Sequence, residues 1–288
     1  MIKTTRQLKD KINNISGGNP NKAQTLFRNY MMERFLERVS LSKYKNNFIL
    51  KGGMLVASIV GLDMRATMDI DTTVKSLPLN KDKAMEIIKE IADYPLDDNV
   101  IFEINSAEEI MEEHEYSGIR IKLDAYFEKS KQPIKIDIST GDVITPCAVT
   151  YKYPLMFEDR TISVLSYNIE TTLAEKIETI MFRGTANTRM RDFYDIYMIS
   201  ENYNVDLDDL YSAFLATSKN RNSDNLIDDI LGIIDEICED EAMQNNWKNY
   251  INNNYYVSEL DWNEVVESVR NLVTEFLDIS ENEDFIMS

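Results

Sequence analysis

The amino-acid sequence predicts an α+β protein in which a mixed α/β half precedes an all-helical half. Short apolar segments that alternate with a period of two recur between residues 48 and 165, as the strands of a sheet require. From Asn168 onward, apolar residues recur at helical spacing only. A chain of 288 residues is long enough for one or two domains, so we expect one domain over 1–167 and a second over 168–288.

The N-terminal segment is predicted to form two helices before the first strand. Residues 1–17 are typical of a short basic helix closed by a Gly-Gly pair, and an Asn-Pro pair then starts a helix over 21–40. A short apolar strand over 48–51 follows and enters a second Gly-Gly pair. The next helix is expected over Met54–Val60, because a glycine follows it directly.

The same two periodicities predict the remaining elements. A strand over about 68–74 carries two carboxylates, and an amphipathic helix over 80–93 comes after it. Further strands are expected over 100–110, 117–128, 133–140 and 161–165, with a hairpin turn at 130–133. The helices of the second half are expected over 169–183, 188–201, 206–217, 224–239 and 259–279, with another near 241–252.

Charge is distributed unevenly along the chain. The net charge is −19, but residues 201–288 hold 21 acidic and 4 basic residues and so contribute −17. Residues 1–50 hold 10 basic and 3 acidic residues, a net charge of +7. A phosphate-bearing partner can therefore meet the N-terminal helices, although an ordinary solvated basic face is the alternative. The acidic C-terminal part either contacts a basic protein partner or serves only for solubility.

The composition argues against several classes of protein. No run of about 18 apolar residues is present, so we expect neither a transmembrane helix nor a membrane partner. The basic N-terminus lacks the apolar stretch of a secretory signal, which makes the cytoplasm the expected location. His114 is the single histidine, which argues against Ser-His-Asp or Cys-His catalysis and against a His-rich zinc site. Neither a P-loop nor a dinucleotide-binding pattern appears.

Asp69 and Asp71 are the first candidate site residues. Side chains at i and i+2 of a strand project to the same face, so we expect both carboxylates together and Ile70 in the opposite face. Neighbouring carboxylates repel each other unless a cation lies between them, and Mg²⁺ prefers such oxygen ligands together with substrate phosphates. The pair therefore predicts a Mg²⁺ site, with Mn²⁺ as the alternative ion.

Gly52 and Gly53 lie between the apolar strand and the helix that follows it. Backbone N–H groups and the positive end of a helix suit an anion such as a triphosphate. A Gly-Gly pair alone is a weak signal, and so is Asp-x-Asp alone. Metal and phosphate signals within one short unit together suggest a nucleotidyltransferase with an NTP as substrate.

Asp137 is a candidate third metal ligand. It alternates with three isoleucines that are expected to face the core, so its carboxylate faces away from them. In a compact sheet it can lie beside Asp69 and Asp71. An ordinary exposed aspartate on a strand is the alternative.

Lys176 and Asp192 are candidates in the helical half. Lys176 lies beside the apolar face of its helix, where its ammonium group can offset charge on a triphosphate or on leaving pyrophosphate. A surface lysine paired with a neighbouring glutamate is the alternative. Asp192 can orient Lys176 or accept a proton from an acceptor hydroxyl, or it simply favours the dipole of its own helix.

The order of these motifs resembles the AbiEii family of bacterial nucleotidyltransferase toxins, which includes the mycobacterial MenT toxins. The matching motifs span roughly residues 48–200 and stand in the family's order: Lys51-Gly52-Gly53, Arg65-x-Thr67-x-Asp69-Ile70-Asp71, Lys135-Ile136-Asp137-Ile138, Ala174-Glu175-Lys176 and Arg191-Asp192-Phe193-Tyr194-Asp195-Ile196. The C-terminal helices carry no specific match, although helical domains are usual in the family.

The resemblance implies a nucleotidyltransferase fold of the polymerase-beta type that carries a helical C-terminal domain. The implied activity is transfer of a nucleoside monophosphate from an NTP, GTP being among the nucleotides expected to bind, with release of pyrophosphate. In characterised relatives the acceptor is the 3′ end of tRNA, and its modification blocks translation. The protein would be the toxin of a toxin–antitoxin pair linked to abortive phage infection, neutralised by a separately encoded antitoxin, expected to be a winged-helix protein.

The resemblance also assigns roles by motif position. Asp69 and Asp71 would hold Mg²⁺, while Lys176 and Asp192 would be catalytically required and would reach an active-site cleft from the helical domain. Nucleotide and phosphate binding would belong to the glycine motif and to the residues before the carboxylates: Lys51, Gly52, Gly53, Arg65 and Thr67, together with Lys176.

Gly53 departs from the serine that many nucleotidyltransferases of this superfamily carry at that position. The departure removes a hydroxyl donor and leaves only backbone donors for phosphate.

Two other functions are compatible with the same residues. The transfer chemistry can modify a small molecule such as an aminoglycoside, or a protein side chain, in place of RNA. The other alternative is a non-catalytic nucleotide- or partner-binding module, although such a module need not retain all the carboxylates.

Overall fold

The computed structural model describes residues 2–77, 80–110, 118–257 and 260–287, and it gives only the backbone of residues 280–287. His114 lies outside the described residues. The chain forms two compact units. The first comprises Met1–Asp142 and Val149–Ser166, and the second comprises Val143–Ala148 and Tyr167–Ser288.

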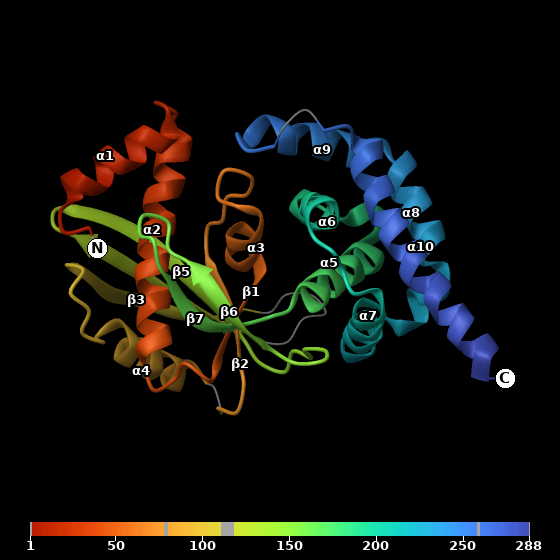
Figure 1. Ribbon diagram of the computed structural model, residues 1–288, viewed down its shortest axis with the longest axis horizontal. Coiled ribbons are helices and arrows are strands. Elements are labelled where there is room, and N and C mark those ends of the chain that lie inside the picture. The colour runs from red at the N-terminus through yellow and green to blue at the C-terminus, as the bar shows by residue number, and fades with distance from the viewer. Residues whose placement is uncertain (1, 78–79, 111–117, 258–259, 288) are drawn as a thin grey trace. The chain divides into compact units, whose positions relative to one another are not determined.

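The first unit is built on a mixed seven-stranded sheet in the order β3-β4-β5-β2-β1-β7-β6 (Figure 1). Its strands are β1 (Phe48–Lys51), β2 (Ile70–Val74), β3 (Val100–Ile110), β4 (Gly118–Phe127), β5 (Ser130–Ser139), β6 (Val149–Pro154) and β7 (Thr161–Ser166). The pairs β2–β5 and β1–β7 are parallel, and the other neighbours are antiparallel. The mixed sheet thus places β2, which carries the Asp-x-Asp motif, at the centre.

Four helices accompany this sheet: α1 (Thr5–Ser16), α2 (Pro20–Leu41), α3 (Gly52–Val60) and α4 (Lys81–Ala92). Side chains cap the starts of the two N-terminal helices, since Thr4 accepts from the Gln7 amide and Asn19 accepts from two amides of α2. The N-terminal helices and the strand after them therefore form as the sequence predicts. The helix α3 starts at Gly52, two residues before the predicted start.

The helix α2 packs on one face of the sheet. Phe35, Leu36 and Val39 of α2 surround a void of about 10 Å³ together with Ile70, Thr72 and Ile136 of β2 and β5. Because side chains alternate along a strand, the residues between those inward-facing positions point to the opposite face. Asp71 and Asp137 therefore lie on the face of the sheet that α2 does not cover.

In its described residues, the second unit contains helices joined by irregular segments, together with the irregular segment Val143–Ala148. Its α-helices are α5 (Ile169–Arg183), α6 (Met190–Asn202), α7 (Leu207–Arg221), α8 (Ile230–Glu239), α9 (Glu241–Asn253) and α10 (Trp262–Met287). Short 3₁₀ segments over Gly184–Ala186 and Asp224–Asp229 precede α6 and α8. The core contains both tryptophans of the chain, Trp247 and Trp262.

The α+β prediction is confirmed, two local predictions are wrong, and one strand was not predicted. The strand β6 was not predicted, because only Tyr153 of its six residues is fully buried and apolar. The expected helix over 224–239 begins as a 3₁₀ segment with no buried residue. The hairpin turn lies at Glu128 and Lys129 rather than at 130–133, with Glu128 in a left-handed conformation at φ 52°. In the described part of the chain, no helix combines the length and apolar character that a membrane span requires.

Candidate active site

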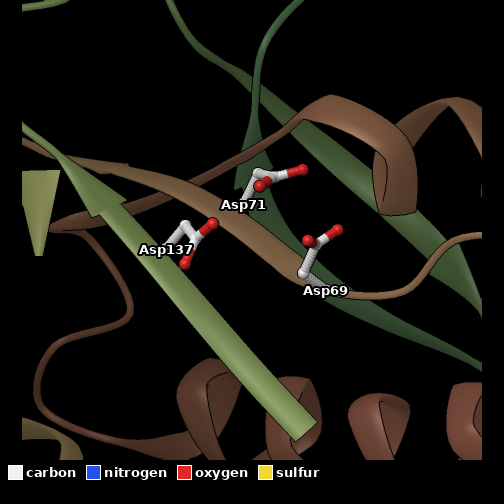
Figure 2. A group of neighbouring side chains, drawn as sticks. All are labelled: Asp69, Asp71 and Asp137. Atoms are coloured by element: carbon white, nitrogen blue, oxygen red, sulfur yellow. The ribbon is translucent and has the colours of Figure 1, made fainter. Parts of the chain in front are cut away.

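Three carboxylates come together on the sheet face that α2 leaves uncovered. Asp71 of β2 lies opposite Asp137 in the parallel pairing with β5, and Asp69 directly precedes β2 (Figure 2). One carboxylate oxygen of each residue lies within 4.8 Å of one from each of the others. The structure therefore joins the three aspartates that the sequence singled out as metal ligands.

The carboxylate group of Asp71 is strongly perturbed. Burial raises its pKa to about 7, and the nearby charges of Asp69 and Asp137 act in the same direction. The Gly53 amide opposes this shift by donating a hydrogen bond of 3.3 Å to Asp71 Oδ2. A cluster of oxygen ligands whose negative charges are only partly balanced is the environment that a divalent cation relieves. The three residues therefore fit a divalent metal ion.

The Gly-Gly turn is built against this cluster. Gly52 has φ +64°, in the left-handed region, and a Cβ atom placed there would lie 2.2 Å from Asp71 Oδ2. The helix α3 starts at Gly52, so its positive end faces the carboxylate to which Gly53 donates. The turn thus lies at the metal cluster, while phosphate binding by Gly52 and Gly53 stays a prediction.

Arg65 and Thr67 are buried beside Gly53. A Cβ atom on Gly53 would lie 2.8 Å from Thr67 Oγ1 and 3.4 Å from Arg65 Nη2. The Thr67 hydroxyl donates to the Asp69 carbonyl over 3.3 Å, and Arg65 donates to the Ala66 carbonyl. The absence of a serine side chain at position 53 therefore has a steric reason, because Thr67 occupies the space where that side chain would begin.

Lys51, at the end of β1, forms an ion pair within the first unit. Its ammonium group lies 2.9 Å from Asp142 Oδ2, and Ser139 also donates to that carboxylate. Burial acts to raise the pKa of Asp142, but Lys51 and Ser139 outweigh burial and lower the pKa to about 2. This pair fixes the strand end from which the Gly-Gly turn starts, and a contact of Lys51 with phosphate stays a prediction.

Three cations near the cluster were not among the predicted site residues. Arg120 of β4 donates from Nε to Asp137 Oδ1 over 2.8 Å and from Nη2 to Oδ2 over 2.6 Å. The Lys135 ammonium lies 3.7 Å from Asp69 Oδ2. Arg28 of α2 donates to the sulfur of Met68, and burial lowers its pKa while Asp69 acts to raise it. The signal that could have found Arg120 was the hairpin register, which sets it opposite Asp137.

Lys176 and the aspartates of α6 form a buried ion-pair triad in the second unit. The Lys176 ammonium lies 2.8 Å from both Asp192 Oδ1 and Asp195 Oδ2. Burial acts to lower the pKa of Lys176, but the two carboxylates outweigh burial and raise it. The alternative of a surface lysine paired with a neighbouring glutamate is wrong, since Lys176 is 9% exposed. Asp195, which is fully buried, belongs to this group as well.

A carboxylate cluster beside a glycine turn at the start of a helix is an arrangement that suits a metal ion and nucleotide phosphates. The comparisons with known proteins give the family. The model of a protein family described as "Nucleotidyl transferase AbiEii toxin, Type IV TA system" matches residues 34–269 of this chain. The chain therefore belongs to the AbiEii nucleotidyltransferase toxin family, and it is a nucleotidyltransferase. The family implies an NTP substrate and a cognate antitoxin.

Solved structures share this fold. MenT4, a nucleotidyltransferase toxin from Mycobacterium tuberculosis, superposes with a TM-score of 0.57 at 12% identity, over 93% of this chain and 98% of MenT4. JHP933 from Helicobacter pylori gives a TM-score of 0.50 at 16% identity, over 92% of this chain and 96% of JHP933. At these identities the likeness concerns the fold alone, and it confirms the expected fold class. No curated protein is significantly similar to the sequence.

Proposed function

We propose that this toxin transfers a nucleoside monophosphate from an NTP to the 3′ end of tRNA in the cytoplasm and thereby blocks translation. The observation that carries the proposal is the cluster of Asp69, Asp71 and Asp137 beside the first turn of α3. Two phosphate-handling features thus occur in one place, as transfer from a triphosphate requires. The choice of tRNA rests on the family resemblance and on the basic N-terminal helices.

Asp69, Asp71 and Asp137 would hold Mg²⁺ or Mn²⁺. When bound, the ion supplies charge stabilisation at the reacting phosphate and orients the triphosphate. Gly52 keeps the turn close to Asp71, because any side chain there would displace that carboxylate. Gly53 presents its amide and the positive end of α3 to the same point, where a phosphate oxygen would be stabilised. Thr67 fills the space beside Gly53 that a side chain at that position would need, and its hydroxyl donates to the Asp69 carbonyl.

We also propose that transfer requires Lys176 and Asp192. The ammonium of Lys176 stays charged in a buried environment because two aspartates hold it. A fixed cation of this kind offsets charge that develops on the phosphates during transfer. Asp192 would position Lys176, and its carboxylate can accept a proton from the acceptor hydroxyl.

An open cavity on the first unit, lined by both polar and apolar side chains, supports a nucleic-acid acceptor. The cavity has a volume of about 460 Å³ and lies between α1, α2 and the start of β5. Its walls carry two lysines, Lys9 and Lys131, and one aromatic ring, Phe27, with side-chain amides from Asn13, Gln24 and Gln132. Lysines bind phosphates, amides bind base edges, and an aromatic ring stacks on a base. Because the cavity is lined by α2 and the carboxylate cluster lies on the sheet face that α2 does not cover, this combination suits a segment of RNA away from the reacting 3′ end.

The acceptor class can be tested by incubating the purified protein with each labelled NTP and Mg²⁺. Total tRNA, lysate protein and aminoglycosides are offered in parallel, and Asp69→Ala is compared with Asp82→Ala, an exposed residue of α4. We expect label on tRNA with the wild type and with Asp82→Ala, and none with Asp69→Ala. If only protein or only an antibiotic were labelled, that molecule and not tRNA would be the acceptor. NTP binding without any labelling would indicate a non-catalytic module.

The contribution of the cavity to RNA binding can be measured separately. The double variant Lys9→Gln/Lys131→Gln should raise the KM for tRNA and flatten its salt dependence, since two phosphate contacts are removed. Lys89→Gln, an exposed lysine of α4, is the matched control. An unchanged KM and salt slope in the double variant would exclude the cavity as an RNA contact.

Toxicity and neutralisation form the third test. Added to a cell-free translation reaction with NTPs, the wild type should stop protein synthesis, and Asp69→Ala should not. The gene beside this one is expected to encode a winged-helix antitoxin, whose co-expression should restore growth. Growth arrest by Asp69→Ala equal to that of the wild type would contradict a toxin that acts by transfer.

A further inference from the structure

Two of the three carboxylates proposed to hold the metal, Asp137 and Asp69, already have a cationic partner. Arg120 and Asp137 face each other across β4 and β5, and both carboxylate oxygens of Asp137 accept from the guanidinium, at 2.8 and 2.6 Å. Lys135, two residues before Asp137 on the same strand face, approaches Asp69 Oδ2 to 3.7 Å. Each of these ligands therefore has an internal counter-ion.

A divalent cation would compete directly with these ion pairs. A bidentate arginine–carboxylate pair occupies both oxygens of Asp137 and cancels the charge that would attract the metal. Arg120 and Lys135 have side chains that are 30% and 40% exposed, so both can move without unpacking the core. When a metal ion binds, Arg120 and Lys135 can therefore leave their aspartates and turn to another anion, and neither cation has to stay buried without a partner.

The neighbouring residues make the exchange directional. Lys135 lies directly opposite Lys122 in the pairing of β4 and β5, and like charges at such positions repel. Lys122 is itself paired with Glu108 at 2.6 Å, which offsets part of this repulsion. With all three aspartates ionised, the cluster and the two cations sum to a charge of −1, and a divalent ion changes this sum to +1. The excess positive charge then favours an anion at the same place.

We propose that Arg120 and Lys135 are exchangeable counter-ions, which hold Asp137 and Asp69 before the metal binds and then bind a substrate phosphate. This inference rests on the proposed function, and it makes metal and phosphate bind with positive coupling. The phosphate belongs either to the NTP or to the RNA backbone, because both present the same oxygens to a guanidinium.

The first measurement titrates the full-length protein with Mn²⁺ alone, followed by calorimetry. Arg120→Gln should bind Mn²⁺ about fivefold or more tightly than the wild type, because the competing cation is gone. Lys152→Gln is the control, since Lys152 is an exposed lysine of β6 that donates to Ser163, and its Mn²⁺ affinity should stay unchanged. Arg120→Lys keeps the charge without the bidentate contact, so its Mn²⁺ affinity should lie between those of the wild type and Arg120→Gln. This variant still tests the proposal if Arg120→Gln folds poorly.

The second measurement separates the two sources of phosphate. The KM values for NTP and for tRNA are determined for the same variants, and Arg120→Gln should raise whichever one the guanidinium contacts, by about fivefold or more. A raised KM for NTP alone assigns the triphosphate, and a raised KM for tRNA alone assigns the RNA backbone.

Three outcomes would overturn the inference. Equal Mn²⁺ affinity in the wild type and in both Arg120 variants would show that Arg120 does not compete with the metal. If Arg120→Gln bound Mn²⁺ more tightly but left both KM values unchanged, Arg120 would compete with the metal without binding a substrate phosphate. A wild-type protein that binds no Mn²⁺ would remove the proposed metal site, and the inference with it. In the first two cases the proposed function stands.

Discussion

A Cβ atom on Gly52 would lie 2.2 Å from Oδ2 of Asp71 and 2.8 Å from its Cβ and Cγ atoms. The glycine turn and the central aspartate of the cluster therefore fit together only because position 52 has no side chain. The same residue adopts φ +64°, which other residues reach only at a cost. Two independent constraints thus select glycine at this point.

Gly52→Ala should abolish most transfer while leaving the protein folded. Strain at positive φ costs about 1–2 kcal/mol of stability. A carboxylate displaced by about 1 Å can cost about 100-fold in rate. The checks are transfer rate, Mn²⁺ affinity and thermal unfolding.

Gly17→Ala separates strain from displacement. Gly17 has φ +57°, and nothing lies within 4 Å of a Cβ atom placed on it. Gly17→Ala should therefore lose the same stability to backbone strain as Gly52→Ala, while its transfer rate and Mn²⁺ affinity stay normal. Equal loss of transfer in the two variants would mean that backbone strain, and not contact with Asp71, explains the requirement for glycine.

Gly53→Ser should be harmful alone and tolerated together with Thr67→Ala. A Cβ atom at position 53 would meet Thr67 Oγ1 at 2.8 Å, so the serine overpacks a buried position at a cost of about 1–3 kcal/mol. Removing that hydroxyl leaves the Thr67 Cβ at 3.5 Å, an ordinary contact. The measurement is a double-mutant cycle on stability and transfer rate, in which the two substitutions should compensate. Strictly additive losses would show that Thr67 does not determine the residue at 53.

The aspartates could be predicted from the sequence because their positions follow from local periodicity. Asp71 and Asp137 alternate with buried residues, so strand geometry orients both, and Asp69 lies in the bend directly before β2. The pairing of Asp71 with Asp137 further required that β2 and β5 be parallel neighbours in the register that aligns them. The helical half was predictable in the same way, from apolar spacing.

Arg120 was missed because its role depends on hairpin register. A turn placed at 130–133 sets a residue other than Asp137 opposite Arg120, whereas the true turn at Glu128 and Lys129 aligns the two. The Gly53–Thr67 contact was equally hidden, since it joins residues whose distance depends on the path of an irregular loop. Pairings of this kind depend on tertiary geometry that no local pattern encodes.

Asp142→Asn should destabilise the first unit at neutral pH and have little effect in acid. The pKa of Asp142 lies near 2 in the folded protein, below its ordinary value of 3.8, because Lys51 and Ser139 outweigh burial. A lowered acid pKa contributes stability above pH 3.8, about 2 kcal/mol here, and the contribution is lost as the pH falls toward 2. Wild type and variant should therefore differ at pH 7 and converge near pH 2.

Hydrogen exchange of the β1 and β5 amides provides the readout for Asp142→Asn. Asp63→Asn is the control, because Asp63 pairs with Lys22 while 67% exposed, and such surface pairs contribute less than about 1 kcal/mol. A difference between wild type and Asp142→Asn that persists unchanged at pH 2.5 would contradict the assignment of the lowered pKa to the ion pair with Lys51.

Asp195→Asn should destabilise the second unit by about 3 kcal/mol, because it leaves the buried Lys176 ammonium with one carboxylate instead of two. Tryptophan fluorescence can report this loss of stability, because Trp262 contacts Phe193 of α6 with ring centroids 5.1 Å apart. Both tryptophans of the chain belong to this unit, so fluorescence-detected unfolding follows it selectively. The urea midpoint should fall by about 1–3 M.

The control for Asp195→Asn is a second ion pair in the same unit. Asp235 pairs with Arg270 while 62% exposed, so Asp235→Asn should move the urea midpoint by much less. If the two substitutions had equal effects, burial would not be what makes the Lys176 triad stabilising. Transfer activity of Asp195→Asn, measured well below its unfolding midpoint, adds a second criterion. Activity retained there, with activity lost in Asp192→Asn, would assign Asp195 to holding Lys176 in place and Asp192 to the reaction itself.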